Sequence, residues 1–351
     1  MAGNTYGEMF KITTFGESHG AAVGVIVDGV TPGVEIDETY IQRQMDRRKP
    51  GQSSVTTPRK EYDKIQILSG VFEGRTTGTP LAIMLHNHDM NPGAYLDIQH
   101  AFRPGHADFT YLQKYGIRDY RGSGRASGRE TAGRVAGGAV ARKLLERRGV
   151  QVLAYTREIG GIACQTFDEE AIEQNAVRAC DPVVAVEMVQ KIEQLALQGD
   201  SCGGIVECRI RGVDPGLGEP VFDKLDAEIA KAMLSIGAVK GIEFGAGFAA
   251  ASMLGSEHND AMSSDGFLSN HAGGIIGGIS TGQEIVFRIS VKPTSSISVA
   301  QRTINVAGEE QEIKTEGRHD PCICPRIVPV VEAMACLVLE DHYKRQAAML
   351  G

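Results

Sequence analysis

The sequence contains no tryptophan, and aromatic residues make up only 6% of its 351 residues. An excess of positive charge is lacking as well, because the formal net charge is -8. Proteins that bind nucleic acid generally combine a basic surface with aromatic side chains on which bases stack. The composition therefore argues against a nucleic-acid partner, and strong, salt-sensitive binding to DNA would be needed to revive that hypothesis.

Long apolar runs and paired cysteines are also lacking. Glycine or a charged residue interrupts every apolar run well short of a membrane span, and no signal sequence opens the chain. We therefore expect a soluble, cytoplasmic protein with no membrane partner. The seven cysteines lack the C-x-x-C spacing of zinc modules, which predicts reduced, structural thiols and no bound metal. A metal held by His319, Cys322 and Cys324 is a weaker alternative.

Glycine, in contrast, is abundant. The chain has 43 glycines, well above the average usage of about 7%. Many of them flank polar motifs, which favours a binding function because glycine lets the backbone approach a ligand closely. Positive charge is concentrated in one tract, where His106 is followed by Arg118, Arg121, Arg125, Arg129 and Arg134. Within an acidic protein, such a cluster predicts a local anionic ligand.

The end of this tract predicts the start of a helix that runs from Ser127 to Arg148. Ser127 and Glu130 have the spacing of a capping box, and apolar residues then recur at near-helical spacing among many small residues. Flanked by Arg125 and Arg129, this helix N-terminus would favour a phosphate through its free N–H groups. In the alternative interpretation, Ser127 only caps the helix and the arginines only solvate a surface.

The sequence contains an internal repeat. The segment GESHGAAVGVIVDGVTPG, which begins at Gly16, aligns without a gap with GDSCGGIVECRIRGVDPG, which begins at Gly199. More loosely, GRTTGTPLAIML from Gly74 resembles GISTGQEIVFRI from Gly278. We infer two related halves, roughly residues 1–150 and 195–345, around a pseudo-two-fold axis.

The expected elements form an α+β pattern, because strands and helices do not alternate regularly as in a doubly wound fold. Strands are expected at Val23–Asp28, Gln66–Phe72, Leu81–Leu85, Ile205–Arg211 and Glu284–Val291. Helices are expected at Ile36–Asp46, Ser127–Arg148, Glu169–Asn175, Pro182–Leu197, Phe222–Ser235 and Arg326–Lys344. Long loops, which are often functional, are expected at Lys49–Glu61, Asn87–Gly105 and Gly255–Gly274.

Three segments place a titratable residue among glycines or prolines: Ser18-His19, Arg103 through Asp108, and Arg318 through Pro321. Such settings suit proton transfer, because histidine titrates near neutrality and flanking turns can fix its orientation. A single histidine is more often structural than catalytic. The hypothesis of a catalytic site therefore depends on the segments together.

Taken together, the motifs resemble those of chorismate synthases. The matching segments are TTFGESHG (Thr13–Gly20), DRRKPGQS (Asp46–Ser53), SGVFEGRTTGTP (Ser69–Pro80), FRPGHAD (Phe102–Asp108), KYGIRDYRGSGRASGRET (Lys114–Thr131), SNHAGGIIGGISTGQ (Ser269–Gln283), KPTSSI (Lys292–Ile297) and GRHDPC (Gly317–Cys322). Eight motifs in the family's order, spread over nearly the whole chain, make a far more specific match than one glycine-rich segment would.

The resemblance implies one catalytic domain over residues 1–351, built as a β-α-β sandwich with helices packed between antiparallel sheets. It implies a carbon–oxygen lyase that removes phosphate and a ring hydrogen from 5-enolpyruvylshikimate 3-phosphate in a 1,4-anti elimination. The product is chorismate, at the last step of the shikimate pathway toward the aromatic amino acids. The substrate carries a phosphate and two carboxylates, which explains why an acidic protein would concentrate arginine in one pocket.

The family's cofactor is reduced FMN. In the family it donates electron density transiently as phosphate leaves and then accepts the proton or hydrogen, so the net reaction is redox-neutral. NADPH is a possible reductant of the flavin, and an external flavin reductase is the other source of reduced flavin. The resemblance also implies a homotetramer.

Carried over motif by motif, the resemblance assigns the catalytic residues. Ser18 and His19 would face the leaving phosphate, with His19 as its proton donor. His106 would stabilise or protonate the reduced flavin. Asp320 and Ser127 would serve the flavin nitrogen that removes the ring hydrogen.

Two sets of binding residues follow from the same motifs. The candidates for holding the substrate are Ser18, Arg48, Arg103, Arg129, Arg134 and Arg318. The candidates for holding FMN are Arg48, Arg125, Ala126, Ser127, Gly237, Ala238, Gly277, Lys292, Pro293, Thr294, Ser295, Ser296 and Arg318. The segment from Lys292 to Ser296 offers a cation and three hydroxyls, which suit the flavin phosphate, although it also fits an ordinary turn after a strand.

Two positions depart from the family's common pattern. Many relatives have a basic residue where Ser54 stands, which puts one NADPH or substrate contact in doubt, and Arg59 could compensate. Relatives more often have RSSAR than the RASGR found here, and Ala126 is tolerable if the backbone contacts the ligand.

A second hypothesis is a flavin- or phosphate-binding protein without turnover. Such a protein would keep the arginines and the KPTSS segment while tolerating loss of the proton-transfer residues. Because His19, His106 and Asp320 are all present, the sequence favours the enzyme.

Overall fold

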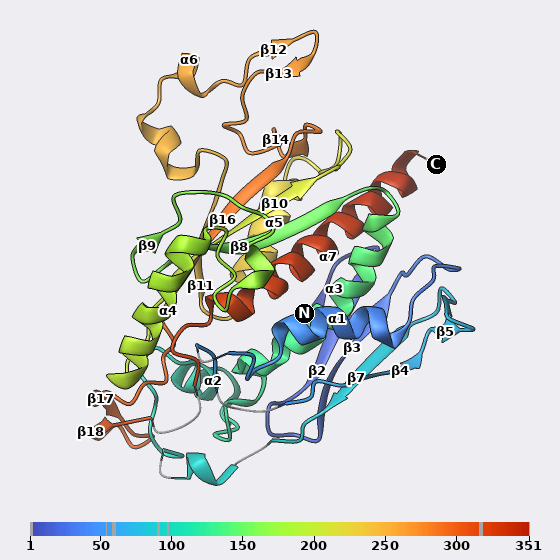
Figure 1. Cartoon of the computed structure of the whole chain (residues 1–351). Helices are drawn as coiled ribbons and strands as arrows, with labels where there is room; N and C mark the ends of the chain where they lie inside the picture. Colours follow the sequence, from blue (N-terminus) through green and yellow to red (C-terminus); the bar gives the residue numbers. More distant parts are fainter. Residues whose placement is uncertain are drawn as a thin grey trace.

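Two five-stranded antiparallel sheets enclose a layer of helices in the computed structural model (Figure 1). The structure describes residues 3–53, 55–57, 61–89, 92–96, 98–315 and 319–350. Three residues considered above, Ser54, Arg59 and Arg318, lie outside the described residues. The arrangement confirms the α+β class and the expected sandwich of helices between antiparallel sheets.

The two sheets are built from different parts of the chain. The first has the strand order β1-β2-β3-β7-β4, with β1 (Thr5–Tyr6), β2 (Lys11–Gly16), β3 (Ala22–Asp28), β7 (Leu81–His86) and β4 (Ile65–Ser69). The second has the order β11-β16-β10-β8-β9, with β11 (Val239–Phe244), β16 (Ile285–Val291), β10 (Gly204–Arg211), β8 (Gln151–Ile159) and β9 (Ile162–Ala163). Hairpins outside the sheets are β5–β6 (Val71–Phe72 and Arg75–Thr76), β12–β13 (Met262–Ser263 and Gly266–Phe267), β14–β15 (Ile275–Ile276 and Ile279–Ser280) and β17–β18 (Gln301–Ile304 and Glu310–Ile313).

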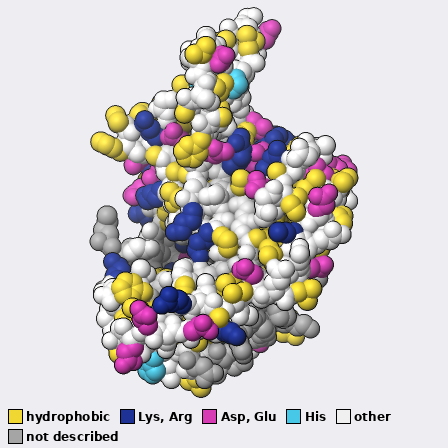
Figure 2. Space-filling view, turned by 90° about the vertical axis from the view of Figure 1, so that its left-hand side faces the viewer, with side chains coloured by type: hydrophobic (Ala, Val, Ile, Leu, Met, Phe, Trp, Pro, Cys, Tyr) yellow, Lys and Arg dark blue, Asp and Glu magenta, His cyan; other side chains and the backbone are white. Residues whose placement is uncertain are grey.

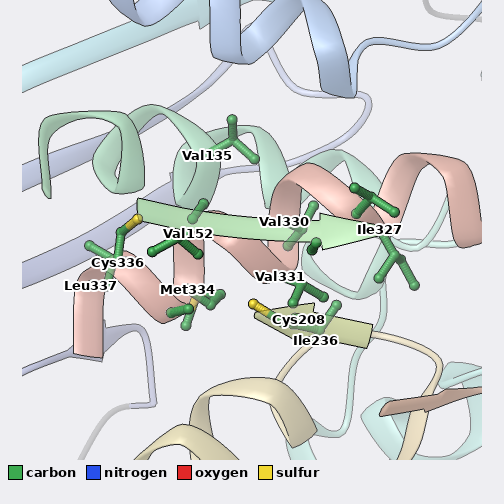
Figure 3. Close-up of a cluster of buried hydrophobic side chains, with 14 of the residues drawn as sticks. Val135, Val152, Cys208, Ile236, Ile327, Val330, Val331, Met334, Cys336 and Leu337 are labelled. Atoms are coloured by element: carbon green, nitrogen blue, oxygen red, sulfur yellow. The ribbon is translucent and has the colours of Figure 1, made fainter. Parts of the chain in front are cut away.

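Two helices, α3 (Thr131–Glu146) and α7 (Cys324–Leu350), run through the middle of the sandwich (Figure 1). Helix α3 packs on β2, β3 and β7, α7 packs on β8 and β10, and the two helices pack on each other. The small residues of α3 permit this, since a Cβ added at Gly138 would lie 2.4 Å from the Cβ of Ala333. Side chains of α3, α7, β8 and β10 form the core between them, among them Val135, Val152 and Cys208 (Figure 3).

The remaining helices surround this centre. They are α1 (Glu38–Arg48), α2 (Asp108–Tyr115), α4 (Pro182–Leu197), α5 (Leu225–Leu234) and α6 (Gly255–His258). Helices α1 and α5 pack on α7 from the first and second halves of the chain respectively. No helix among the described residues combines the length and the apolar character that crossing a bilayer requires.

The expected two related halves are confirmed by the order of the elements. The first half runs β2, β3, α1, β4, β7, α3, and the second runs β8, β10, α5, β11, β16, α7. Their strands lie in the same order in the two sheets, β2-β3-β7-β4 and β8-β10-β16-β11. The second half begins with β8, which follows α3 directly and ends before residue 195. As its strands define it, the second half therefore starts earlier than the sequence predicted.

The halves also repeat individual hydrogen bonds. The hydroxyl of Thr76 accepts from the backbone of Val34 at 3.0 Å and donates to the carbonyl of Thr31 at 2.6 Å. In the second half, the hydroxyl of Ser280 makes the same two bonds with Leu217 and Asp214, at 2.9 Å and 2.7 Å. The loose similarity between the segments from Gly74 and Gly278 therefore reflects a shared local structure.

Most expected elements are confirmed, and α4 agrees to the residue. The helix expected at Glu169–Asn175 is wrong, because only a 3-10 turn forms there, at Ile172–Gln174. The Asn175 amide instead donates to the carbonyls of Ala171 and Ala179, and such side-chain bonds compete with helical ones. Strands β2, β8 and β11 and helix α2 were not expected from the sequence.

Candidate active site

A cavity of about 640 Å³ lies where the N-termini of α3 and α7 come together. Thr131 and Arg134 of α3 line it together with Ile327 and Val330 of α7. Its volume is in the range of about 300–1,000 Å³ that small-molecule sites occupy. Figure 2 shows Lys and Arg side chains gathered around a hollow in this face of the molecule. Two helix N-termini and several cations at one cavity make a site for an anion.

Most of the site residues expected from the sequence line this cavity. Those that do are Arg48, Arg103, His106, Arg125, Ala126, Ser127, Arg129, Arg134, Gly237, Ala238, Lys292, Pro293, Thr294, Ser295, Ser296 and Asp320. Ser18, His19 and Gly277 are not among the lining residues that the structure describes. The chain thus brings together segments of both halves that lie up to about 270 residues apart, from Arg48 to Asp320.

Arg48 and Arg129 form the most deeply buried basic part of the wall, with side chains only 1% and 3% exposed. Nε of Arg48 and Nη2 of Arg129 are buried without a partner among the described residues. Burial, together with the positive charges of Arg129 and Arg326, lowers the pKa of Arg48 to about 10 despite the nearby carboxylate of Asp63. Unused donors and mutual repulsion of cations both favour the entry of an anion.

Arg103 is held by a carboxylate rather than projecting freely. Its Nε donates to Asp108 Oδ2 at 2.8 Å, and its Nη2 donates to Asp108 Oδ1 at 2.9 Å. The aligned fork of the guanidinium matches the two oxygens, as in other bidentate pairs. Arg103 therefore contributes a fixed piece of the wall.

His106 sits beside the same pair. Its Nδ1 lies 3.3 Å from Nη2 of Arg103 and 3.4 Å from Oδ1 of Asp108. A neutral His106 with its proton on Nε2 can accept from Arg103, and a protonated His106 can donate to Asp108, so both states find a partner. Burial, supported by the charge of Arg103, lowers the pKa of His106 although Asp108 acts in the opposite direction. The residue is thus arranged for proton exchange.

Asp320 approaches the cavity from the segment that precedes α7. One carboxylate oxygen accepts from the backbone N–H of Thr57 at 2.9 Å, and the other pairs with Arg326. Its neighbour His319 also lines the cavity. Burial, with help from Arg103 and His106, lowers the pKa of His319 to about 4.

The loop from Lys292 to Ser296 carries polar groups of the kind expected to hold a phosphate. The Lys292 ammonium donates to the hydroxyl of Ser295, which in turn donates to the carbonyl of Gly105 at 2.8 Å. Thr294 Oγ1 is buried without a partner among the described residues. On the other side, the N–H of Lys292 donates to the carbonyl of Ala238, whose φ of 75° is unusual for a residue other than glycine. Strained backbone of this kind is concentrated at functional sites.

The start of α3 is confirmed near Ser127, but the capping box is wrong. The Ser127 hydroxyl accepts from the N–H of Arg129 at 3.3 Å, as a cap does. The Glu130 carboxylate does not reach back; it accepts from Thr14 at 2.8 Å and from Arg134 at 2.8 Å. The Glu130 carboxylate therefore binds the Thr14 hydroxyl and the Arg134 guanidinium instead of the backbone N–H of Ser127.

Arg125 and Arg134 are tied to the walls of the cavity. Arg125 donates to the hydroxyl of Thr14 at 2.7 Å and lies 3.7 Å from Glu130. Arg134 donates to the hydroxyl of Ser235 at 2.6 Å, which joins α3 to the end of α5. Both arginines line the cavity, and Arg134 also connects the two halves of the chain.

Ser18 and His19 lie behind residues that line the cavity. Nδ1 of His19 is 3.1 Å from the Ser18 hydroxyl, and the His19 ring packs edge-on against Tyr95, which lines the cavity, with 5.3 Å between the ring centroids. A Cβ added at Gly122, another lining residue, would lie 2.3 Å from Cε1 of His19. Gly277 is different, since it occupies the exposed turn between β14 and β15.

Several residues at the cavity were not expected from the sequence. His319, Arg326, Glu61, Tyr95 and Tyr111 line it. The segment GRHDPC was recognised and Asp320 was expected at the site, but nothing in the segment indicated that His319 would also face the cavity. Among the described residues, no group of three or more His, Cys, Asp or Glu side chains is placed to hold a metal ion.

The comparisons with known proteins all point to one family. A family model described as "Chorismate synthase" matches residues 10–343. Chorismate synthases of Roseiflexus castenholzii and Desulfosudis oleivorans are each 56% identical to this chain over 99% of its length, covering 98% and 99% of those relatives. The chorismate synthase of Methanosarcina mazei is 54% identical over 98% of this chain and 97% of its own length.

A solved structure agrees with these relatives. A crystal structure of chorismate synthase superimposes with a TM-score of 0.77 at 30% sequence identity, covering 97% of this chain and 93% of that one. The similarity therefore extends over both halves of the chain and not only over the segments that line the cavity.

Proposed function

Because the chain belongs to the chorismate synthase family, whose members convert 5-enolpyruvylshikimate 3-phosphate to chorismate, we propose that the cavity is where this carbon–oxygen lyase eliminates phosphate. The observation that carries the proposal is the meeting of two helix N-termini with buried arginines that have unused donors. The substrate's phosphate and two carboxylates need such donors.

FMN is the cofactor we propose for the site, and the residues present fit it. Thr294, whose hydroxyl has no partner among the described residues, and Lys292 both line the cavity, so a flavin phosphate would find both a donor and a cation. Arg125, Ala126, Ser127, Gly237 and Ala238 line the neighbouring wall and would hold the rest of the cofactor. When bound in its reduced form, FMN would supply the electron density that lets phosphate leave and would take up the ring hydrogen.

We propose His106 as the proton-exchanging residue on the flavin side of the cavity. Support comes from its two alternative partners, Arg103 and Asp108, which suit the neutral and protonated states respectively. Asp320 is proposed to act with Ser127 near the flavin nitrogen that removes the ring hydrogen. In this role the pairing of Asp320 with Arg326 would orient the carboxylate.

On the phosphate side we propose His19 as proton donor, supported by its packing against Tyr95 in the cavity wall. Ser18 is proposed to act with it. Arg48, Arg103, Arg129 and Arg134, together with Arg318, are proposed to bind the substrate's anionic groups.

Four further properties are proposed on the strength of the family. They are a homotetramer, a cytoplasmic location, NADPH as a possible reductant of the flavin, and an external flavin reductase as the other source. The tetramer is supported by exposed apolar side chains on the arm that projects from the second sheet, Phe248, Leu254, Met262 and Leu268 (Figure 1, top). The seven unpaired, buried cysteines suit a reducing compartment. We also propose that residues 1–351 form one catalytic domain, because α3 and α7 join the halves.

The reaction is tested by mixing the chain anaerobically with 5-enolpyruvylshikimate 3-phosphate and chemically reduced FMN, with oxidised FMN as the control. Equal amounts of phosphate and chorismate, formed only with reduced flavin, are expected. Absence of product from folded protein that binds FMN would contradict the proposed turnover and favour a protein that only binds flavin.

The place of the cofactor is tested with a matched pair of threonines. Thr294 and Thr156 both have a buried hydroxyl without a partner among the described residues, but only Thr294 lines the cavity. Thr294→Val should weaken FMN binding by about ten-fold or more, as loss of one hydrogen bond to a charged group does. Thr156→Val should leave FMN affinity unchanged, and equal affinities in the two variants would remove the flavin phosphate from this loop.

A further inference from the structure

Asp63 is a fully buried carboxylate directly behind the basic wall of the cavity. Its side chain is 0% exposed, and it is not one of the residues that line the cavity. One carboxylate oxygen pairs with Nη2 of Arg48 and the other with Nη1 of Arg129. The residue therefore touches both buried arginines of the wall without facing the ligand itself.

The backbone of Asp63 is held in place for this contact. Its φ is 48°, in the left-handed region that residues other than glycine enter at some cost. The Gln42 side chain donates to the carbonyl of Asp63 at 3.1 Å and accepts from the N–H of Ile65 at 3.1 Å. This clamp joins α1 to the start of β4 and fixes the carboxylate between the two guanidinium groups.

The two pairs decide which donors remain for a ligand. Arg129 also donates from Nε to the Asn87 side chain at 2.8 Å, which leaves its Nη2 without a partner among the described residues. Arg48 keeps Nε unpartnered and makes only long contacts from Nη1, 3.4 Å each to Gly128 and Thr131. Asp63 thus takes one terminal nitrogen from each arginine and sets the direction of the others.

The charge of Asp63 is as important as its geometry. Burial alone would raise the pKa of Asp63, but Arg48 and Arg129 hold it far below its usual range, so the carboxylate stays ionised. Without it, two buried guanidinium groups would face each other and Arg326 with no compensating charge between them. Removal of one partner from a buried ion pair leaves such an uncompensated charge.

We propose that Asp63 is a positioning residue for the phosphate elimination: it fixes Arg48 and Arg129 so that their remaining N–H groups meet an oxyanion of the substrate. This inference rests on the proposed function of the cavity. It differs from a purely structural role, because a positioning residue affects the binding of an oxyanion even in a variant that folds normally.

The chain offers a matched control in Glu332 of α7. This carboxylate is 2% exposed and also bridges two arginines, accepting from Arg47 at 2.5 Å and from Arg142 at 2.6 Å. None of these three residues lines the cavity. The two clusters thus each have a buried carboxylate between two arginines but differ in their contact with the ligand site, and Arg47 and Arg142 are 20% and 19% exposed.

The experiment compares Asp63→Asn with Glu332→Gln in the full chain. Dissociation constants for inorganic phosphate and for 5-enolpyruvylshikimate 3-phosphate are measured with oxidised FMN, where no turnover occurs, and kcat and KM are then measured with reduced FMN. Asp63→Asn should weaken oxyanion binding and raise KM by at least about ten-fold, with a smaller loss of kcat, because a buried charged pair is broken at the site. Glu332→Gln should lower the melting temperature and leave both binding constants within about two-fold.

Equal effects of the two substitutions on binding, or wild-type binding in Asp63→Asn, would overturn the positioning role. If Asp63→Asn does not fold, Asp63→Glu keeps the charge and displaces the guanidinium groups by one methylene. It should then raise KM while melting close to the wild type, and a wild-type KM in this variant would also overturn the inference. If the wild type binds both ligands but does not turn over, the proposed function is contradicted instead. The positioning role can still be judged in that case, because the binding constants are measured without turnover.

Discussion

The two halves of the chain hold their cavity-lining loops with the same contact. In the first half, the Ser18 hydroxyl donates to the carbonyl of Gly122 at 3.2 Å. In the second half, the hydroxyl of Ser201, its counterpart in the repeat, donates to the carbonyl of Thr294 at 2.8 Å. Each serine precedes β3 or β10, and each acceptor lies in the segment between β7 and α3 or between β16 and α7. The serine contact is therefore part of the scaffold that both halves share.

The next residue differs between the halves. His19 follows Ser18, whereas Cys202, a buried thiol, follows Ser201. The shared serine thus positions a loop in both halves, and only the first half has added a titratable ring at that point. We infer that the primary role of Ser18 is to hold the Gly122 loop, and that the proton chemistry of this turn belongs to His19.

A similar difference separates the starts of the two central helices. Ser127 precedes α3 by four residues, from 127 to 131, and Asp320 precedes α7 by four, from 320 to 324. The neutral hydroxyl of Ser127 caps the 3-10 turn at Gly128–Glu130 that precedes α3, whereas Asp320 brings a carboxylate paired with Arg326. Equivalent positions before the two helices therefore carry different charges, although each half places one histidine at the cavity, His106 and His319.

The largest effects are expected where each half supplies its own titratable group. His106→Ala from the first half and Asp320→Ala from the second should each slow turnover by about 10²–10⁴-fold, the usual contribution of acid–base residues. Both variants should fold, because each side chain lies at the cavity rather than in the core. Single-turnover rates with reduced FMN provide the measurement. Near-normal turnover in either variant would remove that residue from the mechanism.

The turn that carries His19 in the first half and Cys202 in the second gives a second test. His19→Ala should slow turnover by about 10²-fold, because a proton donor is lost, whereas Cys202→Ala should change it by less than two-fold. Cys202 lies in the equivalent turn but outside the lining of the cavity. Phosphate release and melting temperature are measured for both variants. A comparable loss of turnover in Cys202→Ala would show that the turn itself, and not the histidine, is what matters.

Much of the fold could be predicted from the sequence because its signals are local. The gapless alignment of the segments from Gly16 and Gly199 correctly indicated that the halves share β3 and β10. Apolar periodicity and small residues located α3 within a few residues. Strands β2 and β8 escaped because Lys11–Gly16 is polar and short, and because Gln151–Ile159 includes charged residues whose partners come from β10.

The site was predictable only in part, for a related reason. The arginine tract and the KPTSS segment reach the cavity because the repeat places both loops at one end of the sandwich. Asp63 could not be recognised, since a lone aspartate in the segment EYDKI looks like an exposed charge until its arginine partners are placed in space. The capping box failed likewise, because Thr14, distant in sequence, attracts the Glu130 side chain.

The shared serines predict smaller and separable effects. Ser201→Ala should loosen the Lys292–Ser296 loop and weaken FMN binding by about three- to ten-fold, as loss of one hydrogen bond does, with little change in the substrate KM. Ser18→Ala should instead act on the Gly122 loop and raise the substrate KM by a similar factor. Flavin fluorescence and steady-state kinetics distinguish the two. If both substitutions change the same constant, the loops of the two halves do not act independently.

The smallest effect concerns the two histidines that face the cavity from opposite halves. His106 has the carboxylate of Asp108 at 3.4 Å, which partly offsets the lowering of its pKa. For His319, burial and the charges of Arg103 and His106 outweigh the nearby carboxylate of Asp320, and its pKa falls to about 4. The stability of the folded chain should therefore depend on pH more strongly through His319 than through His106.

The sign follows from linkage. Between about pH 4 and pH 6.5 an unfolded His319, with the ordinary pKa of about 6.5, binds a proton that the folded one does not, so the free energy of unfolding falls as the pH falls. His319→Asn should remove on the order of 2 kcal/mol of this loss, and His106→Asn should remove less. Urea unfolding of both variants and the wild type from pH 7 to pH 4.5 measures the difference, in which the titration of all other groups cancels. If His106→Asn reduced the pH dependence of the free energy of unfolding more than His319→Asn does, Asp108 would favour the protonated imidazole less than its distance indicates. The two walls of the cavity would then be electrostatically alike.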